Sequence, residues 1–319
     1  MKYLRPIIII VICLIIPLSA ERAFDITDIG TSAESVAGGG VHTISNTAHS
    51  IFLNPALLDH DINWSVDVFQ TQTLEDVKIN TISISKSYNN SSFGLGYTWT
   101  GMDGIQGAIT SNSEILPGET YEYNHSKFYL GGKMQLNEFF STGVTLKLMT
   151  TRLGSYSGKG MNSDVGLLFE KPSYSIALGI HNILRMNKMT YTNHQGSALQ
   201  DEEFPFKLFI NASKQMTIKS LNSRLYLQLN QYDKHPMLYS GGFKINHQKF
   251  PFLEGLLGYR HMFHLDKTIG RKSIGLNLNI KGIKLSYAYE RSETPIFDNM
   301  HYTSLSFSKL ARSRTLSKP

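Results

Sequence analysis

The sequence predicts an all-β protein, folded as a transmembrane antiparallel β-barrel of about 14 strands. Three observations predict it. From residue 62 onward apolar and polar residues alternate with a period of two, the alternating runs number about fourteen, and short links between them alternate with long ones. Successive side chains of a strand point to opposite faces, whereas a helix repeats every 3.6 residues. The 16 Tyr, 17 Phe and 26 Gly are typical of many strands joined by turns.

The first twenty residues have the zones of a secretory signal peptide. Lys2 and Arg5 precede an apolar run over residues 7–16, and Ala20 ends a short region of small residues. The apolar run is shorter than the roughly 20 residues that a spanning helix needs, so export is favoured over anchoring. The mature chain is expected to begin near Glu21. Cys13, the single cysteine, lies in the leader, so disulfides and thiol chemistry are not expected in the mature protein.

The charge of the chain argues against nucleic acid as a partner. The formal net charge is +6, and removing Lys2 and Arg5 with the leader leaves +4. The basic residues are scattered, without a long Lys/Arg block or an aromatic-basic signature. A weakly basic solvated surface accounts for them.

Residues 21–60 differ from the rest of the chain because they are rich in small residues and do not alternate. Gly38, Gly39 and Gly40 let backbone approach other backbone closely. Pro55 forces Asn54 out of the helical region, so Asn54, Pro55 and Ala56 mark a fixed bend before the first strand. We predict a hatch or plug segment at 21–60, a barrel over 61–310 and a basic C-terminal tail at 311–319.

Each alternating run places apolar residues on one face and polar or small residues on the other. Ile82 and Ile84, for example, alternate with Ser83 and Ser85. The predicted strands lie at 62–68, 79–86, 93–99, 128–136, 140–148, 165–169, 174–180, 206–212, 225–229, 239–245, 257–259, 274–280, 283–289 and 305–307. Fourteen is an even number, as single-chain bacterial barrels require.

The links between these runs alternate in length. Short links are predicted at 87–92, 136–138, 170–173 and 281–282, and long ones at 101–123, 151–161, 184–204, 261–271 and 291–300. If the short links are periplasmic turns, both termini are periplasmic. One link breaks the rule, because 214–222 is longer than a tight turn.

The apolar face is expected to point to lipid and the opposite face to a polar lumen. A soluble sandwich would instead bury the apolar face in a shared core. The barrel is favoured because fourteen strands are many for one sandwich and because aromatic residues recur at strand ends, as in a membrane-interface girdle. The polar face carries Asp67, Lys147, Asp164, Lys284 and Glu290.

Lys147 and Asp164 are candidates for a pair inside the lumen. Their neighbours alternate so that both point inward from adjacent strands. A structural salt bridge is favoured over a substrate contact. For Asn54, a hydrogen bond from its amide to the hatch or wall is weighed against a simple turn residue before proline.

No catalytic, cofactor or metal site is expected. The sequence contains no nucleophile elbow or phosphate-cradling glycine loop, and no strand precedes Gly38 as a dinucleotide site would require. His261, His264 and Asp266 are closely spaced, but they match no known metal pattern and are better explained by loop polarity.

The segment from Gly30 to Leu58, with Ala37-Gly38-Gly39 and then Ser50 through Asn54-Pro55-Ala56-Leu57-Leu58, resembles the amino-terminal signature of the FadL-like outer-membrane barrels, and most closely their PorV/PorQ branch. This resemblance implies a 14-stranded barrel whose N-terminal segment folds inside as a hatch. It also implies the outer membrane of a Gram-negative bacterium, with membrane lipid as a partner.

Two functional hypotheses follow from the resemblance. The first is an accessory role in type IX protein secretion in the PorV/PorQ manner, with secretion-machinery proteins or cargo as partners. The alternative is FadL-like passive transport of hydrophobic small molecules such as fatty acids, with a hydrophobic ligand in the lumen. The match of Asn54 to Leu58 favours the first, and a purely structural barrel remains a third possibility.

Overall fold

The computed structural model describes residues 28–59, 61–73, 77–111, 114–193, 197–233, 235–264, 267–292 and 299–310. In these residues the helical elements are α2 (Ala33–Ala37) and the 3-10 turns η2 (His42–Ile44), η3 (Ala48–Phe52) and η4 (Pro55–Leu57). The strands are β1 (Ile62–Thr73), β2 (Val77–Tyr88), β3 (Ser91–Ser111), β4 (Glu114–Gln135), β5 (Phe140–Leu153), β6 (Tyr156–Lys171), β7 (Tyr174–His181), β8 (Lys188–Thr192), β9 (Ala198–Glu203), β10 (Lys207–Ile218), β11 (Leu221–Tyr232), β12 (Leu238–His247), β13 (Phe250–His264), β14 (Lys267–Ile280), β15 (Ile283–Ser292) and β16 (Met300–Leu310). Across the described part of the chain, every helix is too short or too polar to cross a membrane.

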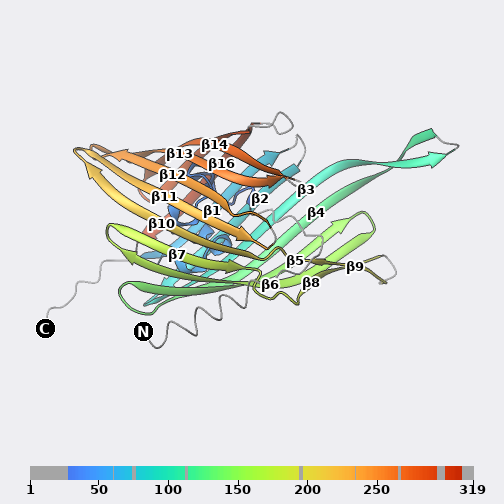
Figure 1. Ribbon diagram of the computed structural model, residues 1–319, viewed down its shortest axis with the longest axis horizontal. Helices are drawn as coiled ribbons and strands as arrows, with labels where there is room; N and C mark the ends of the chain where they lie inside the picture. The colour runs from blue at the N-terminus through green and yellow to red at the C-terminus, as the bar shows by residue number, and fades with distance from the viewer. Residues whose placement is uncertain are drawn as a thin grey trace.

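Fourteen of the described strands, β1–β7 and β10–β16, form a closed antiparallel barrel (Figure 1). Each pairs with a neighbour on both sides, and the pairing of β1 with β16, from Ile62↔Leu310 to Thr71↔Tyr302, joins the two ends of the sheet. The hairpin β8–β9 lies outside this ring and pairs only with the end of β6, at residues 157–159. The predicted barrel of about fourteen strands is confirmed.

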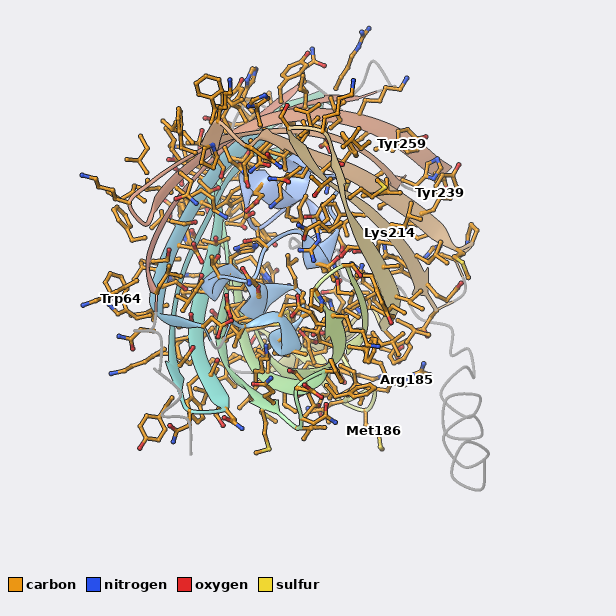
Figure 2. All side chains as sticks on the ribbon, turned by 90° about the vertical axis from the view of Figure 1, so that its left-hand side faces the viewer. Trp64, Arg185, Met186, Lys214, Tyr239 and Tyr259 are labelled. Atoms are coloured by element: carbon orange, nitrogen blue, oxygen red, sulfur yellow. The ribbon has the colours of Figure 1, made fainter. Side chains whose placement is uncertain are left out.

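The apolar face of the strands points outward. On β2, Ile82 and Ile84 are 50% and 49% exposed, whereas Ser83 and Ser85 between them are 2% and 6% exposed. Looking along the barrel, Figure 2 shows the labelled Trp64 and Tyr239 pointing away from the wall. A soluble core would bury the isoleucines, so this inversion identifies a membrane-spanning barrel with an apolar outer surface.

The two ends of the barrel differ. At the turn end, where β1 begins and β16 ends, neighbouring strands are joined by tight turns, and at the hairpin end several pairs continue beyond the wall. The β3–β4 hairpin reaches farthest (Figure 1). The pairing of β1 with β16 places residues 62 and 310 together at the turn end.

Several predicted links are corrected by the structure. The 101–123, 151–161 and 261–271 links are not long loops, because β3–β4, β5–β6 and β13–β14 remain paired through most of these residues, and 184–204 contains β8–β9. The 214–222 link is a tight turn at Lys219 and Ser220, with Lys219 at φ +54°, so it does not break the alternation. Of the 291–300 link, 293–298 lie outside the described residues. Beyond the lipid both faces of a hairpin meet water, so pairing continues without the alternation that predicts strands.

Residues 28–59, called here the inner segment, lie within the ring of strands. Figure 2 shows their short helical turns, in blue, enclosed by the wall. Nearly every residue of the segment is buried, including Ala33, Val36 and Ala37 of α2 at 0% exposure. α2 contacts β13–β16, whereas η4 contacts β4–β6, so the segment spans the lumen between different parts of the wall.

Gly39 is a point of close approach between the inner segment and the wall. Its φ is +77°, and a Cβ atom here would overlap the carbonyl oxygen of Gly241 and lie 2.7 Å from that of Tyr259. The predicted close backbone approach at Gly38–Gly40 is therefore present. Glycine is required here for both its conformation and its lack of a side chain.

We predict that Gly39→Ala displaces the inner segment while the barrel persists. The matched control is Gly104→Ala, because Gly104 has a φ of +73° but no atom within 4 Å of an added Cβ. Both variants carry the backbone penalty of roughly 1–2 kcal/mol for an L-residue at positive φ. Only Gly39→Ala should raise single-channel conductance in planar bilayers, with heat-modifiable migration reporting an intact barrel in both. Equal conductance of the two variants would contradict the prediction.

Candidate functional site

A cavity of about 400 Å³ lies between the inner segment and the wall, and we call it the hairpin-end cavity. Its lining combines apolar side chains with polar and basic ones. It is lined by Asp28, Gly30, Thr31, Ser35, Val36, Gly39, Gly40, His42, Leu53, His181, Pro205, Lys207, Gln228, Asn230, Tyr232, His235, Leu238, Ser240, Arg260, His261, Met262 and Phe263. A cavity of this size and mixed lining is typical of small-molecule sites.

The two permanent cations of the cavity are paired. Lys207 Nζ lies 2.8 Å from Oδ1 of Asp28. Arg260 donates through Nε and Nη2 to the carboxylate of Glu290, at 2.6 and 2.9 Å, and through Nη1 and Nη2 to the carbonyl oxygens of Asp28 and Ile29. These contacts tie the start of the inner segment to β10 and β13. The cavity therefore has polar walls with little uncompensated charge.

An aromatic cluster forms one side of the cavity. The rings of His42 and His181 are stacked with centroids 5.7 Å apart, and both present an edge-to-face contact to Phe209, at 4.4 and 5.0 Å. Gln228 Oε1 accepts from the main-chain N–H of His42 at 2.9 Å. His181 Nε2 and the carbonyl oxygen of Leu53 are 2.6 Å apart. The cluster thus fixes η2 and the end of η3 against β7, β10 and β11.

The imidazole of His42 is neutral at pH 7. Burial lowers the pKa of His42 well below its usual value, and the positive charge of Lys207 and the neighbouring His181 lower it further. A neutral imidazole has one donor and one acceptor nitrogen. His42 can therefore either give or receive a hydrogen bond.

A second cavity, of about 270 Å³, lies toward the turn end of the barrel. Its lining is mostly polar and includes Asp59, Asp61, Lys133, Glu170 and Lys244. Thr43 and Ile44 line this cavity, whereas His42 lines the hairpin-end cavity. Consecutive residues of the 3-10 turn η2 therefore line the two cavities.

Glu34 is the electrostatic anchor of the inner segment. Its carboxylate is 2% exposed, and its oxygens lie 2.5 Å from Lys284 Nζ and 3.3 Å from Lys244 Nζ, with Asn277 donating at 3.0 Å. Burial alone would raise the pKa of Glu34, but the charges of Lys284 and Lys244 outweigh it and hold this pKa well below its usual value. Glu34 is thus ionised and joins α2 to β12, β14 and β15.

The predicted Asn54, Pro55 and Ala56 bend seats the other part of the segment. Asn54 Oδ1 accepts from the main-chain N–H of Ala56 at 3.0 Å, and its Nδ2 donates to the carbonyl oxygen of Leu178 at 3.4 Å. Cβ atoms at Gly143 and Gly166 of the wall would overlap Pro55 and Asn54. Asn54 therefore caps η4 and also contacts the wall, as the sequence reasoning proposed for its amide.

Lys147 and Asp164 lie side by side on β5 and β6. Lys147 Nζ is 2.7 Å from Asp164 Oδ1 and donates to Asn182 Oδ1 at 2.6 Å, while the Asn182 N–H donates to Asp164 at 2.9 Å. Asn182 has a φ of +57° and directly follows β7. The pair thus holds Asn182, where the chain leaves β7. Neither Lys147 nor Asp164 is among the described residues that line the hairpin-end cavity, which favours a structural role.

The closely spaced histidines near 261 do not assemble a site in the described chain. Nε2 of His261 lies 2.9 Å from the hydroxyl of Tyr259. Asp266 and the side chain of His264 lie outside the described residues. Among those that are described, no group of three His, Cys, Asp or Glu side chains is arranged to hold a metal ion.

Sequence reasoning missed Glu34, His42, Gln228 and Arg260. Glu34 carried a usable signal, because it is the single acid between Gly30 and Leu58. An ionisable group in a segment of small and apolar residues needs a partner. His42, Gln228 and Arg260 carried no comparable signal, since their partners are distant in the sequence.

We predict that Glu34→Gln loosens the inner segment. The change leaves two lysines facing a neutral amide, and breaking such a buried pair typically costs about 3–5 kcal/mol. Glu254→Gln is the matched control, because Glu254 contacts the same Lys244 and Asn277 from the wall. Conductance in planar bilayers should rise for Glu34→Gln and stay near wild type for Glu254→Gln. A rise of equal size in both would assign the effect to lumen charge instead.

We also predict that Asn54→Ala makes the barrel permeable to small solutes without unfolding the wall. The substitution removes a helix cap worth about 1 kcal/mol and the contact with Leu178. Asn46→Ala is the control, since Asn46 is exposed on the same segment and its side chain donates within that segment, to Asp59 at 2.8 Å. Liposome swelling with small sugars measures the effect. No gain in permeability would leave Asn54 as a folding residue alone.

No family model matches this chain, and no curated protein matches its sequence. Solved structures do share its fold. A structure of the Pseudomonas putida toluene transporter TodX aligns with a TM-score of 0.61 and 13% identity over 91% of this chain and 100% of that one. The CymD monoaromatic hydrocarbon channel gives 0.60 and 11% over 91% and 99%. The Ralstonia pickettii toluene transporter TbuX gives 0.57 and 11% over 88% and 98%. At these identities the comparisons establish the fold alone, which is a closed antiparallel β-barrel.

Proposed function

We propose that this protein is an outer-membrane channel that admits hydrophobic small molecules, aromatic ones above all, and that residues 21–60 serve as its hatch. The observation that carries the proposal is the hairpin-end cavity. It places Val36, Leu53, Leu238, Met262 and Phe263 around a space of about 400 Å³ inside a membrane-spanning barrel. Apolar side chains around a cavity are what an apolar ligand requires.

The position of the inner segment supports the hatch. Because η2 borders both the hairpin-end cavity and the turn-end cavity, we expect movement of this turn to let a molecule pass from the first cavity to the second. In this proposal the turn end, where β1 begins and β16 ends, faces the periplasm. The chain ends would then both be periplasmic.

The solved structures with the same fold support uptake over secretion. TodX and TbuX are toluene transporters, and CymD is a monoaromatic hydrocarbon channel. A shared fold does not by itself imply a shared function, so the proposal depends on the residues that line the cavity. No catalytic step is part of this proposal.

The cavity differs in one respect from the simplest expectation for uptake. A continuous apolar passage to a gap in the wall would suit a plain hydrocarbon, whereas this cavity also presents His42, Gln228, Asn230 and Ser240. The lining of the cavity is therefore not wholly apolar. The cargo is therefore one that tolerates polar contacts.

The accessory role in type IX secretion finds no support in these solved structures. The motif that favoured the secretion role, Asn54 to Leu58, contains η4, and its contacts lie within this turn and with the inner face of the wall. A channel hatch needs these contacts as much as a secretion barrel does. Normal display of surface cargo in a deletion strain would exclude the secretion role.

We predict that Ser240→Trp blocks uptake. Ser240 is buried on the inner face of β12 and lines the cavity, so an indole there occupies much of its space. Tyr239→Trp is the control, because Tyr239 immediately precedes Ser240 on β12 and its side chain points outward, to lipid (Figure 2). Initial uptake of labelled toluene is measured in cells that lack other hydrocarbon channels.

Cells with the wild-type chain or Tyr239→Trp should take up toluene several times faster than cells without the barrel. The uptake rate of cells with Ser240→Trp should fall to that of cells without the barrel. Heat-modifiable migration of each variant controls for folding. Uptake by wild-type cells no faster than by cells without the barrel would refute the proposed function.

A further inference from the structure

Two lysines flank one tyrosine on the lipid-facing side of the wall, at the turn end. Tyr174 of β7 pairs with Lys171 of β6 on one side and with Lys214 of β10 on the other. Tyr174 is 36% exposed, and it lies on the same face of β7 as the exposed Ile176 and Leu178. Directly paired residues of neighbouring strands share a face of the sheet. The three side chains therefore form one row on the outer face, which we call the turn-end basic row.

Aromatic rings surround Lys171 in this row. Its Nζ lies 5.2 Å from the ring centroid of Phe139, 5.7 Å from that of Phe169 and 5.9 Å from that of Tyr174. Aromatic rings are enriched where a membrane meets water, at the level of the lipid headgroups. No carboxylate of the described residues lies within 4 Å of the ammonium group of Lys171 or Lys214. The row therefore brings two cations to the headgroup level, where a lipid can supply the anion.

A groove of about 740 Å³ begins beside the basic row on the same outer face. It is lined by β10–β13, and Leu225 at its edge is the cross-strand partner of Lys214. Gly241 stands between Leu227 and Tyr259 in the register of β11, β12 and β13, and it supplies no side chain to fill the groove. A Cβ atom on Gly241 would make ordinary contacts, at 3.5 Å. The groove is therefore room for an apolar chain on the lipid side of the wall.

A second groove, of about 370 Å³, is lined by β6, β7, β10 and β11. Ile210 and Leu229 line both grooves, so the two adjoin. Leu178 lines the second groove and is four residues from Tyr174 along β7, which is about 13 Å at the rise of a strand. Half of the hydrocarbon core of a bilayer is about 15 Å deep. Both grooves are therefore within reach of acyl chains whose headgroup lies at the basic row.

The basic row and the grooves together fit a phospholipid with an anionic headgroup. A phosphate diester accepts charge-assisted hydrogen bonds from the ammonium groups of Lys171 and Lys214, and the hydroxyl of Tyr174 can donate a third. A headgroup that carries its own ammonium group would bring a further cation beside the two lysines, which costs energy. Two adjoining grooves also match the two acyl chains of one lipid.

We propose that the outer face of β6, β7 and β10–β13 is a binding site for one anionic phospholipid. Its phosphate contacts the turn-end basic row, and its two acyl chains lie in the two grooves. With the turn end toward the periplasm, as proposed above, the lipid belongs to the periplasmic leaflet. The site lies outside the wall, so it does not depend on which cargo the hairpin-end cavity accepts.

The headgroup contacts are tested by native mass spectrometry of the purified protein with phosphatidylglycerol or phosphatidylethanolamine of identical acyl chains. The wild type should retain one phosphatidylglycerol roughly tenfold better than phosphatidylethanolamine, because each lysine favours an anionic lipid. The double variant Lys171→Gln, Lys214→Gln should retain both lipids equally. Lys86→Gln with Lys309→Gln is the matched control, because these lysines flank Trp64 at the same end and line neither groove. This control should keep the wild-type preference.

The acyl-chain contacts are tested with Gly241→Leu, which fills the larger groove and leaves the basic row unchanged. Retention of phosphatidylglycerol should fall several-fold. Gly255→Leu is the control, since a Cβ atom there also makes only an ordinary contact, 3.6 Å from Ile245, and Gly255 lines neither groove. Heat-modifiable migration reports the folding of every variant.

Several outcomes would overturn the proposal. Equal retention of the two lipids by the wild type would show that the headgroup charge is not recognised. An equal loss in Lys86→Gln, Lys309→Gln would assign the preference to basic charge anywhere at the turn end. Equal retention by Gly241→Leu and Gly255→Leu would show that no chain lies in the groove. A dimer of the barrel that disappears in Gly241→Leu would assign the groove to a second copy of this chain instead.

Discussion

Closure of the sheet is the constraint on which the rest of this structure depends. In hydrocarbon no water satisfies the backbone groups of a strand edge, so each strand needs a partner on both sides. The pairing of β1 with β16 meets this need over residues 62–71 and 302–310. A ring of fourteen strands is wider than the eight-stranded barrels whose side chains fill their own interior. Closure therefore creates a lumen that the wall alone does not fill, and the inner segment occupies it.

The inner segment that fills this lumen explains why the wall contains glycines, which strand propensity alone does not explain. Glycine weakens an ordinary strand, but it permits close approach of another chain. Gly242 and Gly258 face the turn at Gly38–Gly39, while Gly143 and Gly166 face the bend at Asn54–Ala56. Gly94 and Gly96 similarly face Ile51 and Phe52. The inner segment and the wall are thus matched by small residues on both sides of the contact.

The sequence predicts those features of the fold and the site that depend on residues close together in the chain. Strand positions were predictable because lipid imposes a period of two, as at Ile82 and Ile84. The extension of β3–β4 beyond the lipid was not, because water solvates both faces there. The bend at Asn54 and the close approach at Gly39 follow from backbone rules. The anchor formed by Glu34 joins residues 250 positions apart, to Lys284, and no local pattern reveals such a partner.

The strengths of these contacts indicate which part of the inner segment yields first. α2 is held by the ion pairs of Glu34, and η3 by main-chain donors to Ser65 and Asp67 of β1. η2 lies between them and is held by the hydrogen bond from the His42 main chain to Gln228, by the ring contacts of His42 with Phe209 and His181, and by the burial of Ile44 against α2. A single hydrogen bond contributes about 0.5–1.5 kcal/mol, against about 3–5 kcal/mol for breaking a buried ion pair. Local movement of η2 leaves the ion pairs of Glu34 intact, so it is a less costly way to join the two cavities than movement of α2, and the residue that lines the hairpin-end cavity at this turn is His42.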